Sequence, residues 1–258
     1  MTVTYVEEPV AAPRHAFIIG GCHIAGVGIG ENPPFWRVVT DWWNADEIET
    51  SGHLTIPKAY DMLQRRVTLP SGSLFILQLG HFDSWQAFSR VSPIRKKNFS
   101  GFRPASIATD KKNYDPVFKN SLTHLSRKAA EGILGWAFDR LTIRDKEIDA
   151  AKRKISDEFD KLAKFLNYSS PKAVIVLSTF PTVSIRINHN RLIMNQILKY
   201  YANIHGFTYI NVWEEIKSSL LTVNFPARSL ILDSIHLNAN GHDIVGKVII
   251  KKLKEIFY

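Results

Sequence analysis

The sequence predicts an α/β domain in which helices cover both faces of a parallel β-sheet. Short, continuously apolar runs recur along the 258 residues, for example residues 74–79 (LFILQL) and 173–177 (AVIVL). Such runs are typical of strands that are buried on both faces. Stretches with apolar residues at helical spacing separate these runs, and glycine directly follows several of them. This alternation favours a parallel sheet joined by helical crossovers.

Five strands and five helices are expected in alternation. The strands are expected at residues 15–19, 46–50, 74–79, 173–177 and 207–212. The helices are expected at residues 36–43, 57–66, 143–166, 190–204 and 241–257. Pro57 suits the first turn of the second helix, and the third helix has apolar residues spaced three and four apart. Together these elements predict one three-layer α/β/α domain of flavodoxin-like architecture, with about five parallel strands.

The composition excludes several classes of protein. Hydrophobic residues make up 45% of the chain, which allows a sizeable core and argues against a disordered protein. A single cysteine, Cys22, rules out a disulfide-stapled scaffold. The beginning of the chain lacks the basic and apolar regions of a secretory signal, and no apolar run is long enough to span a bilayer. We therefore expect a soluble, cytoplasmic protein.

Residues 84–141 separate the third and fourth strands by more than one crossover helix requires. We expect an inserted helical or loop subdomain here, which serves as a lid, a basic patch or an oligomer contact. Within it, residues 118–141 fit an amphipathic helix that packs on the domain. Contact with a second copy or a peripheral contact with a membrane surface are the alternatives. The oligomeric state stays open.

Positive charge is concentrated in the same segment. The chain has a formal net charge of +9, and residues 84–128 hold ten basic and two acidic residues. Such a field attracts phosphates, acidic carrier proteins, anionic glycans or anionic membranes, while a solvated loop that maintains solubility is the plain alternative. Nucleic acid is not an expected partner, because the predicted fold matches no nucleic-acid-binding module. The candidate residues for binding an anionic donor are Arg95, Lys96, Lys97 and Arg103.

Ligands of open parallel sheets bind beyond the carboxyl ends of the strands, so the loops after the strands are the expected place for a site. The first such loop contains Cys22, whose sulfur is expected near helical N–H groups that favour a thiolate. A late loop contains Asp233 three residues before His236, a spacing that lets the carboxylate orient the imidazole. Together these residues supply a nucleophile, a base and an orienting acid.

The order of these motifs resembles that of the SGNH, or GDSL-type, hydrolase and acyltransferase superfamily. The closing block of that family, Asp-x-x-His continuing Leu-Asn-x-x-Gly-His, matches residues 233–242 almost completely. The first block matches at Gly20, with Cys22 at the position of the serine. Gly52 falls at the glycine of the second block, and residues 80–83 fall at the Gly-x-Asn-Asp of the third. The resemblance therefore implies an α/β hydrolase or acyltransferase with a cysteine nucleophile.

Carried over position by position, the resemblance assigns three catalytic residues and two oxyanion donors. It implies that Cys22 is the nucleophile, His236 the general base and Asp233 the group that orients this base. The backbone N–H groups of Cys22 and Gly52 are then expected to donate to the oxyanion that forms during acyl transfer.

Three positions depart from the family pattern. Cys22 replaces the serine, Gly21 replaces the aspartate of the first block, and Phe82 replaces the asparagine that would donate to the oxyanion. Loss of one such donor typically costs about 2.7–4 kcal/mol of transition-state stabilisation. Another polar group is therefore expected to compensate, or the activity is altered. The remaining candidates near this place are the post-strand residues His23, His53, His81 and Asp83.

The cysteine favours acyl transfer over hydrolysis, because an acyl-cysteine is a thioester that reacts readily with thiols and amines and slowly with water. We expect a Cys-dependent acyltransferase that uses acyl-coenzyme A or an acyl carrier protein and a glycan-type or other hydroxyl or amine acceptor. An SGNH-type esterase or thioesterase is the alternative enzyme, and a non-catalytic carbohydrate-binding module with a degenerate site is the alternative outside catalysis. No permanently bound cofactor or metal is expected, because the sequence lacks a metal-ligand spacing and a dinucleotide fingerprint.

Overall fold

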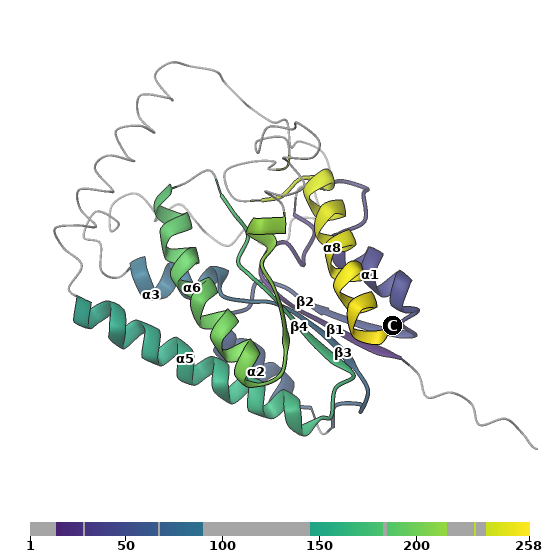
Figure 1. Cartoon of the computed structure of the whole chain (residues 1–258), viewed down its shortest axis with the longest axis horizontal. Helices are drawn as coiled ribbons and strands as arrows, with labels where there is room; N and C mark the ends of the chain where they lie inside the picture. The colour runs from purple at the N-terminus through teal and green to yellow at the C-terminus, as the bar shows by residue number, and fades with distance from the viewer. Residues whose placement is uncertain are drawn as a thin grey trace, which may run out of the picture.

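A five-stranded parallel sheet organises the protein (Figure 1). The computed structural model describes residues 14–27, 29–66, 68–89, 145–182, 185–215, 230 and 236–258. The strands are β1 (His15–Gly20), β2 (Glu47–Ser51), β3 (Leu74–Gln78), β4 (Ala173–Leu177) and β5 (Thr208–Ile210). Their order in the sheet is β2-β1-β3-β4-β5, and every neighbouring pair is parallel.

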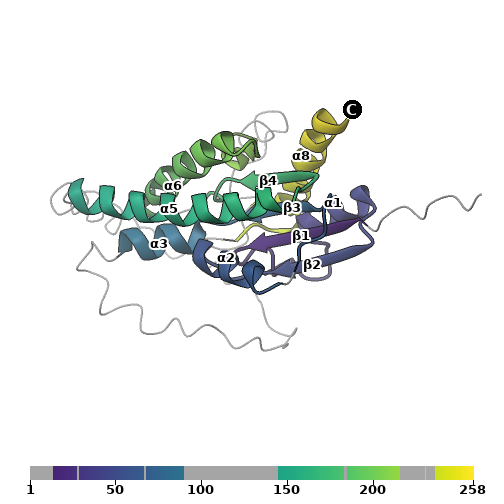
Figure 2. The ribbon, with the colours of Figure 1, turned by 90° about the horizontal axis from the view of Figure 1, so that it is seen from below.

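Helices cover both faces of this sheet (Figures 1 and 2). One face packs against α1 (Phe35–Trp43) and α8 (Ala239–Phe257). The opposite face packs against α2 (Ile56–Gln64), α3 (His81–Ser89), α5 (Asp145–Tyr168) and α6 (Ile185–Ile204). The expected three-layer α/β/α architecture with five parallel strands is confirmed.

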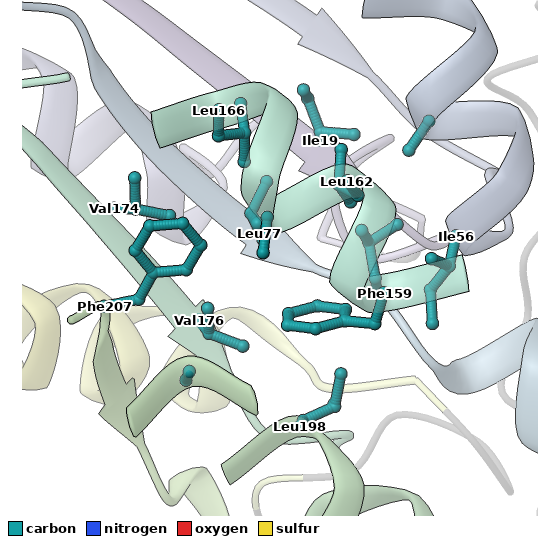
Figure 3. Packing of buried hydrophobic residues seen from close by; sticks show 14 of the residues in the cluster. Ile19, Ile56, Leu77, Phe159, Leu162, Leu166, Val174, Val176, Leu198 and Phe207 are labelled. Atoms are coloured by element: carbon teal, nitrogen blue, oxygen red, sulfur yellow. The ribbon is translucent and has the colours of Figure 1, made fainter. Parts of the chain in front are cut away.

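The two hydrophobic cores follow from the alternation of side chains along each strand. Phe17 and Phe75 point to the core under α2, α5 and α6, and their rings stack with centroids 4.9 Å apart. Ile18 and Ile76 belong to the core under α1 and α8. Figure 3 shows how Phe159 of α5 packs among strand and helix residues of the first core. Burial on both faces explains why the strands read as continuously apolar.

All ten expected elements are present, and their ends shift by a few residues. The largest shift is at α6, which begins at Ile185 rather than at residue 190, whereas β5 is shorter than residues 207–212. The expectation missed α3, because its sequence HFDSWQAFS has no clear helical spacing of apolar residues. Gly80 supplies the turn before this helix with a φ of 91°.

Helix α3 includes the first residues of the segment expected as an insertion at residues 84–141. Residues 84–89 belong to α3, and Phe88 of that helix joins the core under α5 and α6. The rest of the expected insertion, and the amphipathic helix expected at residues 118–141, lie outside the described residues. None of the helices in the described ranges is both long and apolar enough to cross a membrane.

The strand order places two predicted site loops next to each other. The sheet runs from β1 to β2 on one side and from β1 through β3 to β5 on the other. At such a reversal the loops leave adjacent strands in opposite directions and open a crevice. The loop after β1 contains Cys22, and the segment after β3 begins at Leu79.

Candidate active site

The Cys22 loop begins with a close approach between β1 and β3. The N–H of Gly21 donates to the backbone oxygen of Gln78 at 3.0 Å and to Oε1 of the same residue at 2.9 Å. A Cβ on Gly20 would lie 2.4 Å from the Gln78 carbonyl oxygen, so this position requires glycine. Cys22 follows directly and is half-buried.

The loop after β2 packs against the Cys22 loop. The N–H of Leu54 donates to the carbonyl of Gly20 at 2.9 Å, and a Cβ on Gly52 would lie 3.2 Å from the carbonyl oxygen of Gly21. Gly52, a predicted oxyanion donor, therefore adjoins the turn that carries Cys22. His53 is exposed, has a φ of 60°, and has its ring centroid 6.1 Å from that of Phe82.

Four histidines from three parts of the chain gather around this turn. The centroid of the His23 ring lies 5.4 Å from that of His81, 5.6 Å from that of His236 and 6.0 Å from that of His242. Cys22 Sγ lies 3.7 Å from Nδ1 of His23. The fold thus places the predicted base, His236, beside the residue that follows the predicted nucleophile.

Burial sets the protonation of three of these imidazoles. It lowers the pKa of His23 and of His81 well below the ordinary value, and repulsion from Arg191 and from any protonated neighbouring histidine lowers both further. Burial, followed by repulsion from His236, lowers the pKa of His242 to about 4. These three rings are therefore neutral at neutral pH and accept protons poorly. His236 is only half-buried, so it has the best access to solvent of the four.

His81 and His23 differ in the partners of their ring nitrogens. His81 lies in the first turn of α3, where its Nε2 accepts from the Phe180 N–H at 2.8 Å. The Nε2 of Gln78 lies 2.6 Å from Nδ1 and 3.0 Å from Nε2 of the same ring. In contrast, Nε2 of His23 is buried with no hydrogen-bond partner among the described residues.

The other third-block residues occupy structural positions at the edge of the site. Phe82 is half-buried, and its aromatic ring has no donor for an oxyanion. Asp83 is buried, and its Oδ1 accepts from the Ile56 N–H at 2.9 Å. Burial raises the pKa of this carboxyl to about 6, although its backbone hydrogen bonds act in the opposite direction. Asp83 thus ties the start of α2 to the start of α3.

Two site residues were not predicted from the sequence. Gln78 is fully buried and links the Cys22 loop to His81; a polar residue inside the run LFILQL was a signal for it. Arg191 of α6 is also buried, and its Nη1 donates to the carbonyl of Phe180 at 2.5 Å. No motif marks Arg191, because only the packing of α6 brings it to the site.

Several predicted residues lie outside the described ranges. They are the orienting acid Asp233 and the donor-binding candidates Arg95, Lys96, Lys97 and Arg103. Their assignments stay predictions, as do the catalytic roles of Cys22 and His236. Among the described side chains, no group of three or more His, Cys, Asp or Glu residues is arranged to hold a metal ion.

Comparisons with known proteins show that the chain has a known fold. No protein-family model matches the sequence, and no curated protein matches it. Among solved structures, a GDSL-family lipolytic protein from Veillonella parvula is similar with a TM-score of 0.54 and 9% identity, over 93% of this chain and 98% of that one. A phospholipase A1 from Streptomyces albidoflavus is similar with a TM-score of 0.51 and 12% identity, over 94% and 100%.

A catalytic mutant of an acetylxylan esterase from Geobacillus stearothermophilus is a third similar structure. It has a TM-score of 0.53 and 12% identity, and the match covers 95% of this chain and 94% of the esterase. At identities of 9–12%, what these three proteins share with this chain is the fold. The sheet order, the helical layers and these matches together show that this protein has the fold of the SGNH, or GDSL-type, hydrolases.

Proposed function

We propose that this protein catalyses acyl transfer through an acyl-cysteine at Cys22. The observation that carries the proposal is the position of this half-buried sulfur, directly after β1 and 3.7 Å from Nδ1 of His23. In the SGNH resemblance this is the position of the nucleophile. Neighbouring loops supply Gly52 and His236, so a nucleophile, a backbone donor and an imidazole share one end of the sheet.

The proposed reaction has two steps. In the first, Cys22 gives its proton to His236, and the sulfur attacks the carbonyl carbon of the donor. A carbon–sulfur bond forms, the bond to the leaving group breaks, and the leaving thiol takes the proton from the imidazole. In the second, an acceptor hydroxyl or amine attacks the acyl-cysteine while the imidazole accepts its proton. The carbon–sulfur bond then breaks, and the thiol regains the proton.

The choice of donor and acceptor follows from the thioester. A thiol nucleophile depends less on a base than a hydroxyl does, and a thioester intermediate favours transfer to an acceptor over release to water. We propose acyl-coenzyme A or an acyl carrier protein as the donor, because both are anionic thioester carriers and the chain is strongly basic, with a net charge of +9. We propose a glycan-type hydroxyl as the acceptor; the fold is shared with an acetylxylan esterase.

Intact-protein mass spectrometry after incubation with acetyl-coenzyme A tests the proposal. We expect the mass of one acetyl group on the wild-type chain and none on Cys22→Ala, which has no other thiol. His236→Ala is expected to slow acetylation by about 10²–10⁴-fold, the range of general acid–base catalysis. His189→Ala changes an exposed histidine of α6 and serves as the matched control. A folded wild-type chain that never acquires an adduct from any acyl donor would contradict the proposal.

An SGNH-type esterase is the second candidate, and it is favoured by the names of the solved structures with this fold. Water would then be the acceptor in the second step. Acyl-cysteine that disappears at the same rate with and without a glycan identifies the esterase. Acceleration by the glycan identifies the transferase. The non-catalytic binding module predicts glycan binding with no adduct.

A further inference from the structure

Arg191 is a buried cation without a carboxylate partner among the described residues. Its side chain lies in α6, and the residue is 6% exposed. One guanidinium nitrogen, Nη1, donates to the carbonyl of Phe180, while Nε has no hydrogen-bond partner within the described part of the chain. A buried charge is costly unless an opposite charge or strong hydrogen bonds compensate for it. A buried guanidinium with a free donor is suited to stabilise negative charge that develops nearby.

The charges around Arg191 identify where such negative charge would lie. Burial lowers the pKa of Arg191 to about 10, so the guanidinium stays cationic at neutral pH. A negative charge on Cys22 acts in the opposite direction and favours the charged guanidinium. The nearby rings of His23 and His81 are neutral for the reasons given above. Arg191 thus places positive charge against Phe180, whose ring contacts His23 beside Cys22.

A hydrogen bond joins Arg191 to Phe180 after β4, and ring contacts join Phe180 to the Cys22 loop. The Phe180 carbonyl accepts from Arg191, and the Phe180 N–H donates to His81. The Phe180 ring meets the His23 ring edge-on with centroids 4.6 Å apart, and His23 in turn contacts Cys22. The hydrogen bond to Phe180 orients the buried guanidinium, and a preorganised cation in a buried site stabilises developing charge strongly.

We propose that Arg191 stabilises the oxyanion that forms when Cys22 attacks an acyl group, in place of the amide that is missing at Phe82. The inference rests on the proposed function, since an oxyanion forms only in acyl transfer or ester hydrolysis. The family resemblance implies an asparagine at position 82 and assigns nothing to position 191. Arg191 would thus compensate from α6 for the donor that the third block lacks.

Alkylation of Cys22 tests the charge without any enzymatic reaction. The sulfur displaces iodide from iodoacetate, which is anionic, or from iodoacetamide, which is neutral, and forms a carbon–sulfur bond in both cases. We expect the wild-type chain to prefer iodoacetate relative to a cysteine peptide. Arg191→Gln is expected to lower the ratio of the two rates by about tenfold, the effect of one nearby unit charge. Arg191→Lys keeps the charge and is expected to keep most of the preference.

Control experiments distinguish the loss of the Arg191 charge from a loss of folded structure. Arg153→Gln removes an exposed arginine of α5 and is expected to leave the ratio unchanged. Circular dichroism and thermal unfolding establish which variants are folded. An unchanged ratio in folded Arg191→Gln would overturn the proposal. If neither Arg191 variant folds, the wild-type ratio decides: a ratio equal to that of the free peptide would overturn it.

Kinetic measurements then distinguish a role of Arg191 in oxyanion stabilisation from a role in binding a charged substrate. Arg191→Gln is expected to lower kcat/KM about 10²–10³-fold for neutral acetyl and anionic succinyl thioesters alike, the usual loss for one oxyanion donor. A loss confined to the succinyl donor would overturn the oxyanion assignment. If the wild type forms no acyl-cysteine while the alkylation ratio still depends on Arg191, the proposed function fails and the placement of the charge is supported.

Discussion

The protonation states of the buried histidines and of the buried arginine determine which chemistry this site can perform. His23, His81 and His242 are held neutral by burial, whereas Arg191 stays charged at neutral pH. A neutral imidazole donates or accepts hydrogen bonds without adding charge. Positive charge is therefore available from the guanidinium, while His236 is half-buried and the other three rings are buried.

At this scale we predict acid sensitivity that depends on His242. In the unfolded chain its pKa is 6.5, whereas in the folded protein it is about 4. Below pH 6.5 the unfolded state binds a proton that the folded state does not, so stability falls as the pH is lowered toward 4. The loss from this residue is at most about 3 kcal/mol. His242→Asn keeps an acceptor for the Phe35 N–H and is expected to remove this part.

Urea unfolding of the wild type and His242→Asn between pH 7.5 and pH 4.5 measures the effect. As the pH falls, the wild type is expected to lose more unfolding free energy than His242→Asn does. His23 and His81 act in the same direction in both proteins, so the variant remains partly acid-sensitive. His189→Asn, on an exposed position, is the control. A constant difference across the pH range would refute the prediction.

Helix packing on the sheet holds the elements that present the site. Phe159 and Leu162 of α5 are fully buried in the core that also contains α2 and α6 (Figure 3). Helix α6 carries Arg191, and Asp83 joins the start of α3 to the start of α2. The site loops are therefore supported by helices whose positions depend on this core.

At the scale of elements we predict a large loss of stability from Phe159→Ala. The substitution removes a fully buried ring and leaves a cavity between α5 and the sheet, which typically costs about 3–5 kcal/mol. Lys161→Ala, on an exposed position of the same helix, is the matched control and is expected to change stability by less than about 0.5 kcal/mol. Urea unfolding at pH 7.5 compares the two. Equal stabilities would mean that α5 does not close this core.

At the scale of the whole molecule, the beginning and the end of the chain meet where α1 packs against α8. Helices α1 and α8 lie side by side on one face (Figure 1). The Phe35 N–H donates to Nδ1 of His242 at 3.2 Å, although 207 positions separate these residues. A Cβ on Gly246 would lie 3.2 Å from the carbonyl oxygen of Phe35, so α8 approaches α1 closely at a glycine. The position of α8 in turn constrains His236, three residues before its first residue, Ala239.

At this scale we predict that Gly246→Leu disturbs both the fold and the site. The larger side chain pushes α8 away from α1, and overpacking of this kind costs about 1–3 kcal/mol. Because His236 precedes α8, formation of the acyl-cysteine is expected to slow as well. Lys247→Leu adds the same side chain at an exposed position of α8 and serves as the control. Unaltered thermal unfolding of Gly246→Leu would show that the helices have room to separate.

Local patterns were sufficient to predict most of the fold and two of the site loops. Apolar runs located the strands, and the motif that ends at His242 placed His236 in a late loop. Helix α3 was missed because its nine residues lack an amphipathic pattern and depend on Gly80 and on packing for their conformation. His81 and Asp83 were consequently expected in a loop, whereas the structure has them in the first turn of that helix.

The sequence by itself determined the three-layer architecture and the position of Cys22 after the first strand, because both depend on periodicity and spacing within short segments. Only the tertiary structure decided that four histidines form one cluster and that Arg191 lies against Phe180 beside them. Those relations depend on which face of α6 and which end of α8 meet the loops of the sheet. Contacts of this kind arise from packing between distant segments, and no local spacing encodes them.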